Sequence, residues 1–400
     1  MIPDNLNPEN YVHLLNEFID HGKQIEPSTN IPKHHITQDI YYYLADYYFK
    51  NNDLNKAIEF YIRDLTLNRD RFNSWVGCAL VLIKFSDEYF CSNGRVFYSS
   101  TDEVLLLGEK VLRCFNEAVR LKKSESKVWF EYGKFAYYIS SYISRVMKFG
   151  PALENSQKEE MKKQRKRFLD RARDCFESAI NSGDCDTIWM NYYFLGKIAE
   201  RSNILQALRY YELFKFHMTS IEHSRSRFGI EIHYRIHACV LKYIYRHKTL
   251  PARVLSQMLV FLSRAKKGKT FGGFVPSDEL EIENEVIEGA EEVKPDLVSM
   301  EIKSRQLFME IVQMCLEAMH RNLQCTQSCS HYKSLYRMAY HYFLSNDPRF
   351  ARKILTESFE LPARFPSSIL DEESSTDTVN FFTISGLFPL INIILHSMES

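Results

Sequence analysis

The sequence predicts an all-α fold built from pairs of antiparallel helices. Three observations support this prediction. Bulky and small residues follow the spacing i, i+3, i+4, i+7, which places them on one helix face; they are Tyr41, Leu44, Ala45 and Tyr48. A helix-breaking run of asparagine and aspartate follows at 51–53, and a second helical stretch begins after it. The pattern returns 34 residues later, a period typical of helical repeats, at Trp75, Cys78, Ala79 and Leu82.

The unit that recurs is a helical hairpin of the tetratricopeptide type. In the first unit, Ala45 on the first helix and Ala57 on the second fall where the two helices should cross, and Tyr61 follows one turn after Ala57. Small side chains at a crossing allow two helices to approach closely. We therefore expect a solenoid of tetratricopeptide-type hairpins with insertions, which forms an irregular array over residues 1–265.

Two of the predicted units are interrupted. An insertion at 86–103 separates the second unit's first helix from its second, which runs from Leu112 to Leu121. Such an insertion is tolerated, because loop-closure entropy rises by only about 0.6 kcal/mol per doubling of length. In the third unit, the first helix continues to about Lys148, and residues 150–167 intervene before Ala172, Phe176 and Ala179 restore the pattern. A fourth unit is compact and carries Tyr192, Leu195, Gly196, Ala199, Ala207 and Tyr211.

The sequence after the fourth unit is expected to hold two closing helices, a charged linker, a further helical region and a tail. Helices at about Glu231–Tyr245 and Ala252–Ala265 lack the repeat pattern, and we expect them to close the first array. Residues 266–297 read as a charged linker. Residues 298–365 should hold a further helix and a hairpin unit with Ala339 and Ala351 at its crossing, and 366–400 are a divergent tail. The apolar stretch 381–395 in this tail is shorter than the roughly 20 residues that span a bilayer.

Composition narrows the class of protein. The 51 basic and 51 acidic residues balance, so no global field draws the chain to nucleic acid or to a membrane. Neither an amino-terminal leader nor a membrane span is recognisable, and we expect a soluble intracellular protein. Nine cysteines, an odd number scattered along helices, favour buried thiols over a disulfide framework.

Enzymatic, metal and cofactor sites are not predicted. His233 and His237 have the i, i+4 spacing of two metal ligands, but no third ligand accompanies them, so packing is the favoured interpretation. Cys325, Cys329 and His331 likewise lack a fourth ligand, and structural cysteines are favoured there. No phosphate-binding loop or ordered catalytic motif occurs, because Ser263 stands where a phosphate-binding loop ending at Thr270 needs its first glycine.

Candidate partner-binding residues lie on the first helices of the units, which line the inner surface of such an array. Aromatic residues beside charged ones suit partner anchoring. Core packing or ordinary surface remains an equal alternative for them. The candidates are Tyr42, Asp46, Phe49, Phe130, Lys134 and Tyr137.

Two charged segments have a second interpretation besides solvated surface. A basic run resembles a nuclear-import signal or a phosphate contact; it consists of Lys162, Lys163, Arg165, Lys166 and Arg167. The acidic stretch at 278–292 could attract a basic partner such as histone tails, although a disordered linker needs no such role.

One segment carries a more specific signal. HYKSLYRMAYHYF at 331–343 resembles the calcineurin-binding protein cabin family, the large tetratricopeptide subunit of the HIRA histone-chaperone complex. Further runs agree with that family, and together they touch most of the chain between about Tyr41 and Phe382. They are Tyr41–Asp64, Arg71–Leu80, Lys127–Arg145, Phe194–Glu200 and Tyr234–Lys242.

The resemblance implies a nuclear, non-enzymatic scaffold that supports replication-independent nucleosome assembly. Its implied partners are HIRA-like and ubinuclein-like subunits, and histones would be reached through that complex. Neither sequence-specific nucleic-acid binding nor membrane association is expected. The chain is much shorter than family members, which suggests a fragment or truncated member, and calcineurin binding is not predicted. The alternative is a tetratricopeptide-like scaffold of an RNA-processing assembly.

Overall fold

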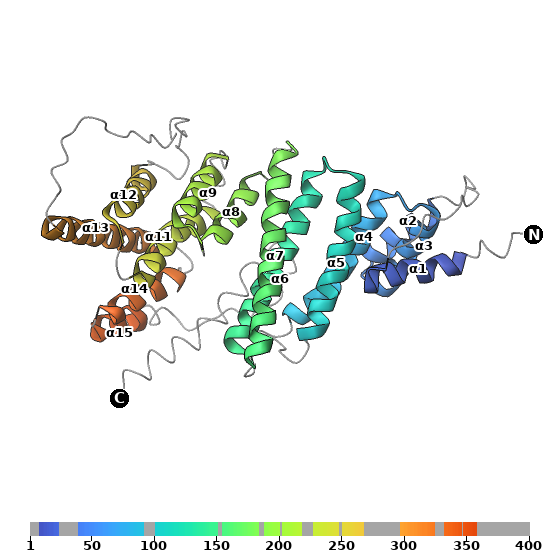
Figure 1. Cartoon of the computed structure of the whole chain (residues 1–400), viewed down its shortest axis with the longest axis horizontal. Helices are drawn as coiled ribbons and strands as arrows, with labels where there is room; N and C mark the ends of the chain where they lie inside the picture. The colour runs from blue at the N-terminus through green and yellow to red at the C-terminus, as the bar shows by residue number, and fades with distance from the viewer. Residues whose placement is uncertain are drawn as a thin grey trace, which may run out of the picture. The chain divides into compact units, whose positions relative to one another are not determined.

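The computed structural model describes residues 8–23, 39–91, 101–150, 154–183, 188–200, 202–217, 227–247, 250–267, 297–324, 332–345 and 347–357. Within these ranges the chain forms fourteen helices and no strands (Figure 1), which confirms the predicted all-α fold. The helices divide between two compact units, residues 1–194 and 195–400, and each is described by itself.

Unit 1 contains seven complete helices and the first half of an eighth. Neighbours in sequence pack as pairs, α2 with α3, α4 with α5 and α6 with α7, and α3 also packs on α4. The helices are α1 (Pro8–His21), α2 (Ile40–Lys50), α3 (Leu54–Leu67), α4 (Phe72–Cys91), α5 (Thr101–Leu121), α6 (Ser126–Phe149), α7 (Asn155–Asn181) and α8 (Ile188–Ala199).

The first hairpin forms as the sequence predicts. The helix break is local: Asn52 adopts a positive φ of 60°, and the Asp53 side chain caps α3 by accepting a hydrogen bond from the backbone N–H of Lys56. Ala45 and Ala57 are both fully buried, which places the two small side chains in the packed interior of the hairpin. The predicted tetratricopeptide-type pairing of α2 and α3 is therefore confirmed.

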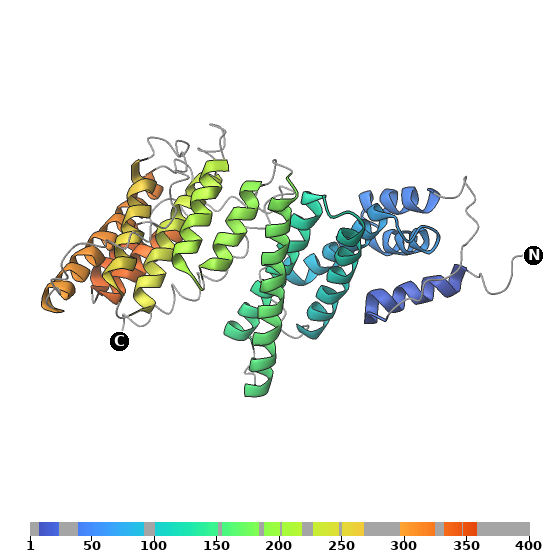
Figure 2. The same cartoon turned by 45° about the horizontal axis from the view of Figure 1, so that its top comes forward.

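The predicted insertions partly lengthen helices. α4 continues to Cys91 and α5 already begins at Thr101, so both ends of the 86–103 segment are helical. The segment after Lys148 is mostly the first half of α7, which begins at Asn155. Figure 1 and Figure 2 show α6 and α7 side by side along their length. The interruption thus produces a long hairpin instead of a surface loop.

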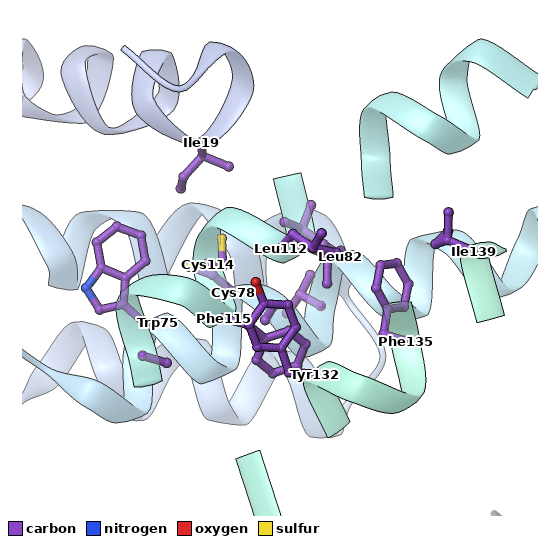
Figure 3. Close-up of a cluster of buried hydrophobic side chains, with 14 of the residues drawn as sticks. Ile19, Trp75, Cys78, Leu82, Leu112, Cys114, Phe115, Tyr132, Phe135 and Ile139 are labelled. Carbon is purple, nitrogen blue, oxygen red and sulfur yellow. The ribbon is translucent and has the colours of Figure 1, made fainter. Parts of the chain in front are cut away.

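Aromatic and small side chains together fill the core of unit 1. Figure 3 shows Trp75, Cys78, Phe115 and Tyr132 within one cluster, and all four are buried. The rings of Phe115 and Tyr132 stack with centroids 5.3 Å apart, which joins α5 to α6. The Trp75 indole N–H donates to the carbonyl of Arg69 at 2.8 Å, so the largest side chain of the core leaves no polar atom unpaired.

Unit 2 continues from the second half of α8. α11 and α12 pack against α13 on the far side of the predicted linker, and α14 pairs with α15. The helices are α9 (Ile204–His217), α11 (Arg227–Arg246), α12 (Ala252–Lys267), α13 (Leu297–Gln324), α14 (Tyr332–Leu344) and α15 (Pro348–Glu357). The predicted hairpin after the linker is present, with Ala339 and Ala351 fully buried.

The division into compact units falls within α8, between residues 194 and 195. The array expected over 1–265 and the separate region expected over 298–365 stay predictions. Within unit 2, α13 buries Ile311 and Cys315 and packs on α11 and α12. Most of the predicted linker, the tail after Glu357 and the Cys325–Cys329–His331 cluster lie outside the described residues.

Candidate partner-binding surfaces

Three of the predicted contact residues lie together on α2. Tyr42, Asp46 and Phe49 are each half-buried, so each offers part of its side chain to a partner. The ammonium group of Lys84 on α4 lies 4.6 Å from the centroid of the Phe49 ring, and the Arg71 guanidinium lies 5.6 Å from that of Tyr42. This α2–α4 surface therefore combines two half-buried aromatic rings with positive charges that lie over them.

Ion pairing adds charge of the opposite sign to the α2–α4 surface. Asp46 pairs with Lys50 one turn later at 2.7 Å, and its carboxylate helps burial to raise the pKa of the Tyr42 hydroxyl. The hydroxyl is therefore a neutral hydrogen-bond donor at physiological pH. A partner helix or strand that crosses here would contact aromatic side chains bordered by one acidic and several basic groups. Many protein interfaces have this combination of aromatic and charged residues.

The other three predicted contacts are less available. Phe130 and Tyr137 on α6 are buried, at 8% and 9% exposure. Their rings lie 6.0 and 5.3 Å from the ring of Phe194 on α8, which covers them. Lys134 is half-buried, pairs with Glu131 at 2.7 Å and lies over the Phe130 ring. Phe130 and Tyr137 are therefore core residues and are not available for direct contact with a partner.

An exposed apolar stripe on α2 was not singled out from the sequence. It follows the spacing i, i+3, i+4, i+7 and consists of Ile40, Tyr43, Leu44 and Tyr47, which we call the α2 stripe. Its side chains are 49%, 65%, 36% and 60% exposed. Apolar residues that recur with this spacing normally face a core or a partner, so the stripe is a second candidate surface.

The basic run lies in the first half of α7. Lys162, Lys163, Lys166 and Arg167 are exposed and Arg165 is half-buried. Two of these charges are compensated, because Lys162 pairs with Glu159 at 2.6 Å and Arg167 pairs with Glu109 of α5. Another face of α7 is apolar and buries Phe168 together with Ala172, Phe176 and Ala179, the three residues expected to restore the repeat pattern.

A polar cluster in unit 2 joins three helices, α8, α9 and α11. Glu200 is the residue immediately after α8, and its carboxylate accepts a hydrogen bond from the hydroxyl of Tyr211 on α9 at 2.5 Å. On α11, Arg235 and Lys242 approach the same carboxylate at 3.8 and 3.9 Å. Burial lowers the pKa of Lys242 to about 8. Perturbed groups of this kind occur at functional sites, but this cluster is enclosed and works as a structural ion network.

Each histidine of the pair on α11 makes a buried hydrogen bond within the protein. His237 donates from Nδ1 to the carbonyl oxygen of His233 at 2.7 Å, and His233 donates from Nδ1 to Oδ1 of Asn322 on α13 at 2.7 Å. Burial pushes the pKa of His237 well below its usual range. Within the described ranges, no three histidine, cysteine or carboxylate side chains converge on a metal-sized site. The pair therefore joins α11 to α13.

The cysteines that can be placed behave as the sequence predicts. Five cysteines of the described residues are buried and form no disulfide, and burial raises the pKa of each thiol; they are Cys78, Cys114, Cys175, Cys239 and Cys315. A thiol with a raised pKa is a poor nucleophile and a poor metal ligand, so these side chains serve packing.

Comparison with known proteins identifies no family for this chain. No protein-family model matches the sequence. One solved structure to which the chain is similar is that of MamA, at 14% sequence identity and a TM-score of 0.34. The match covers 61% of this chain and 100% of MamA. The fold assignment rests on the helices themselves. Among the described helices, none is both long and apolar enough to cross a membrane.

Proposed function

We propose that this protein is a non-enzymatic scaffold that binds other proteins through the first helices of its hairpins. The observation that carries the proposal is the α2–α4 surface, where Tyr42 and Phe49 keep part of their rings open beside the charges of Asp46, Arg71 and Lys84. A surface of aromatic anchors with charges at its edge is suited to protein recognition. The hairpins beneath it hold these side chains in fixed positions.

We further propose that the assembly is a HIRA-type histone-chaperone complex in the nucleus, which supports replication-independent nucleosome assembly. The support is the resemblance of the sequence to the cabin family, and its most specific run, 331–343, covers most of α14. Another run, 41–64, spans most of the α2–α3 hairpin and includes the three open contact residues. The partners would be the HIRA-like and ubinuclein-like subunits, and histones would be reached through them.

Affinity purification tests this assignment. The tagged full chain is recovered from nuclear extract, with and without nuclease treatment, and the bound proteins are identified by mass spectrometry. Recovery of the HIRA-like and ubinuclein-like subunits that survives nuclease is the expected result. Their reproducible absence rejects the histone-chaperone assignment. Recovery of RNA-processing factors that is lost on nuclease treatment would instead favour a scaffold of an RNA-processing assembly.

A further inference from the structure

The positions of the α2 stripe have equivalents in the next repeat, on α4, and there a neighbouring helix covers them. Residues 34 positions after its four members are Ser74, Gly77, Cys78 and Val81 on α4. All four are buried, and α3 packs on α4 at the first two of them. The Ser74 hydroxyl donates to the Asp64 carboxylate of α3 at 2.5 Å, and the Tyr61 ring lies against Gly77. The same face on α2 is therefore built to receive a helix.

No described helix of this chain fills that position. α1 precedes α2 in sequence but packs on α3 and α5. Its Phe18 ring meets Trp75 of α4 at 5.9 Å, and its Asp20 pairs with Lys110 of α5 at 2.7 Å. The face that carries Tyr43 and Tyr47 is left exposed, at 65% and 60% for these two side chains.

The pattern of the stripe is complementary to itself. An antiparallel copy of α2, centred between positions 43 and 44, sets Tyr43 against Leu44 and Tyr47 against Ile40 of the other copy. Every level then pairs one ring with one aliphatic side chain, on both sides of the two-fold axis. An interface in which residue i meets j and j meets i is the isologous contact that closed dimers use.

Charge at the edge of the stripe favours the same arrangement. Asp39 and Lys50 are eleven residues apart, about three helical turns, so they lie on one flank of α2. Antiparallel pairing brings the Asp39 of each copy beside the Lys50 of the other. Both side chains keep room for a second partner, since they are 61% and 72% exposed in their ion pairs with Arg71 and Asp46.

We propose that the α2 stripe is a self-association surface, on which α2 of a second copy of this chain packs antiparallel. A stable interface buries about 800 Å² on each partner, more than one eleven-residue helix provides. The dimer is therefore weak and reversible, and the equilibrium depends on protein concentration. This inference concerns the isolated chain, so its failure leaves the proposed scaffold function untouched.

Sedimentation velocity of the full chain over a hundredfold concentration range tests the association. The wild type should shift from monomer to dimer, and Tyr43→Glu combined with Tyr47→Glu should weaken dimerisation at least tenfold. Met309→Glu, which charges a 61%-exposed apolar side chain on α13, is the matched control and should dimerise like the wild type. A wild type that stays monomeric throughout, or a control as defective as the stripe variant, overturns the proposal.

Cysteine cross-linking tests the antiparallel register and does not depend on a glutamate being tolerated. In the proposed pairing, position 43 lies almost level with itself in the second copy, whereas position 47 is displaced from itself by about 10 Å along the helix. Tyr43→Cys should give a disulfide-linked dimer on mild oxidation, above the background of the wild type, and Tyr47→Cys should not. Equal cross-linking of the two variants, or none in either, contradicts the arrangement.

Discussion

The ring of Tyr61 on α3 lies directly against Gly77 on α4, so closely that a Cβ atom on the glycine would come within 2.3 Å of the ring's Cζ. This contact joins the first repeat to the second. Tyr61 is 3% exposed, and its neighbour Asp64, which is fully buried, accepts the hydrogen bond from Ser74 one turn before Gly77. The absence of a side chain at position 77 is thus what allows two successive hairpins to stack.

Gly77→Ala should destabilise unit 1 by about 1–3 kcal/mol, because the added methyl group displaces the Tyr61 ring from a packed core. Gly108→Ala on α5 is the control: its added Cβ would meet no atom closer than 3.5 Å, and the change should be neutral or stabilising by up to about 1 kcal/mol. Denaturant unfolding measures both. Equal stability of the two variants would mean that the α3–α4 contact is looser than described.

Ala45→Leu should overpack the crossing of α2 and α3, where Ala45 has no exposed surface. The expected loss is about 1–3 kcal/mol, since neither helix of the hairpin can move without disturbing α4. Thermal unfolding followed by circular dichroism reports the loss. An unchanged melting temperature would show that the two helices do not cross at this residue.

Glu212 on α9 should make stability depend on pH. Burial raises the pKa of its carboxyl to about 7 from an ordinary value of 4.5. A raised carboxyl pKa means that the folded state binds the proton more tightly than the unfolded state does. The contribution of Glu212 to the free energy of unfolding is therefore fully present below about pH 4.5 and is lost as the pH rises through about 7. Lys215, whose pKa burial lowers to about 8, titrates above this window.

Glu212→Gln should therefore be more stable than the wild type at pH 7.5, by about 1–3 kcal/mol, and the difference should shrink towards pH 5. Denaturant unfolding at several pH values measures it. Glu177→Gln, on the exposed side of α7, provides the control and should follow the wild type at every pH. A Glu212→Gln difference that is constant with pH would place this carboxyl in a solvated position.

Neutralising the basic run should affect localisation and leave the fold unchanged. Lys163→Ala with Lys166→Ala removes two exposed charges and should change the free energy of unfolding by less than about 0.5 kcal/mol. Under the proposed nuclear assignment, nuclear accumulation of the tagged chain should fall. Lys123→Ala with Lys127→Ala, also exposed, is the matched control and should accumulate normally. Equal nuclear levels of the two variants would contradict a role of this basic run in nuclear import.

The helical pairing could be predicted because its determinants are local. Ala45, Ala57 and the capping residue Asp53 lie within thirteen positions of one another, and the contacts they make are between neighbours in sequence. The extent of the interrupted hairpins was harder to predict, because residues 155–167 carry few apolar side chains to indicate a packed helix, although Glu154 and Gln157 form a capping box at its start. The packing of α13 on α11 could not be predicted, because it joins two helices that are far apart in the sequence.

Surface residues were predicted less well for a related reason. Tyr42 and Phe130 occupy the same position of the first and third units, yet only Phe130 is covered, because Phe194 of the next unit is large enough to reach it. No pattern within one helix records this. The α2 stripe did leave a signal: its large side chains replace the small Ser74, Gly77 and Cys78 of the second unit, and comparison of the two units would have revealed it.

The central claim is that the α2–α4 surface binds a protein partner, and direct binding to the purified HIRA-like subunit tests it. Isothermal titration calorimetry should give a measurable dissociation constant for the wild-type chain, and Tyr42→Ala combined with Phe49→Ala should weaken it at least tenfold. Leu106→Ala, which truncates an exposed side chain on α5, should leave it unchanged. Absence of binding by the wild type, or full affinity in the double variant, would contradict the account.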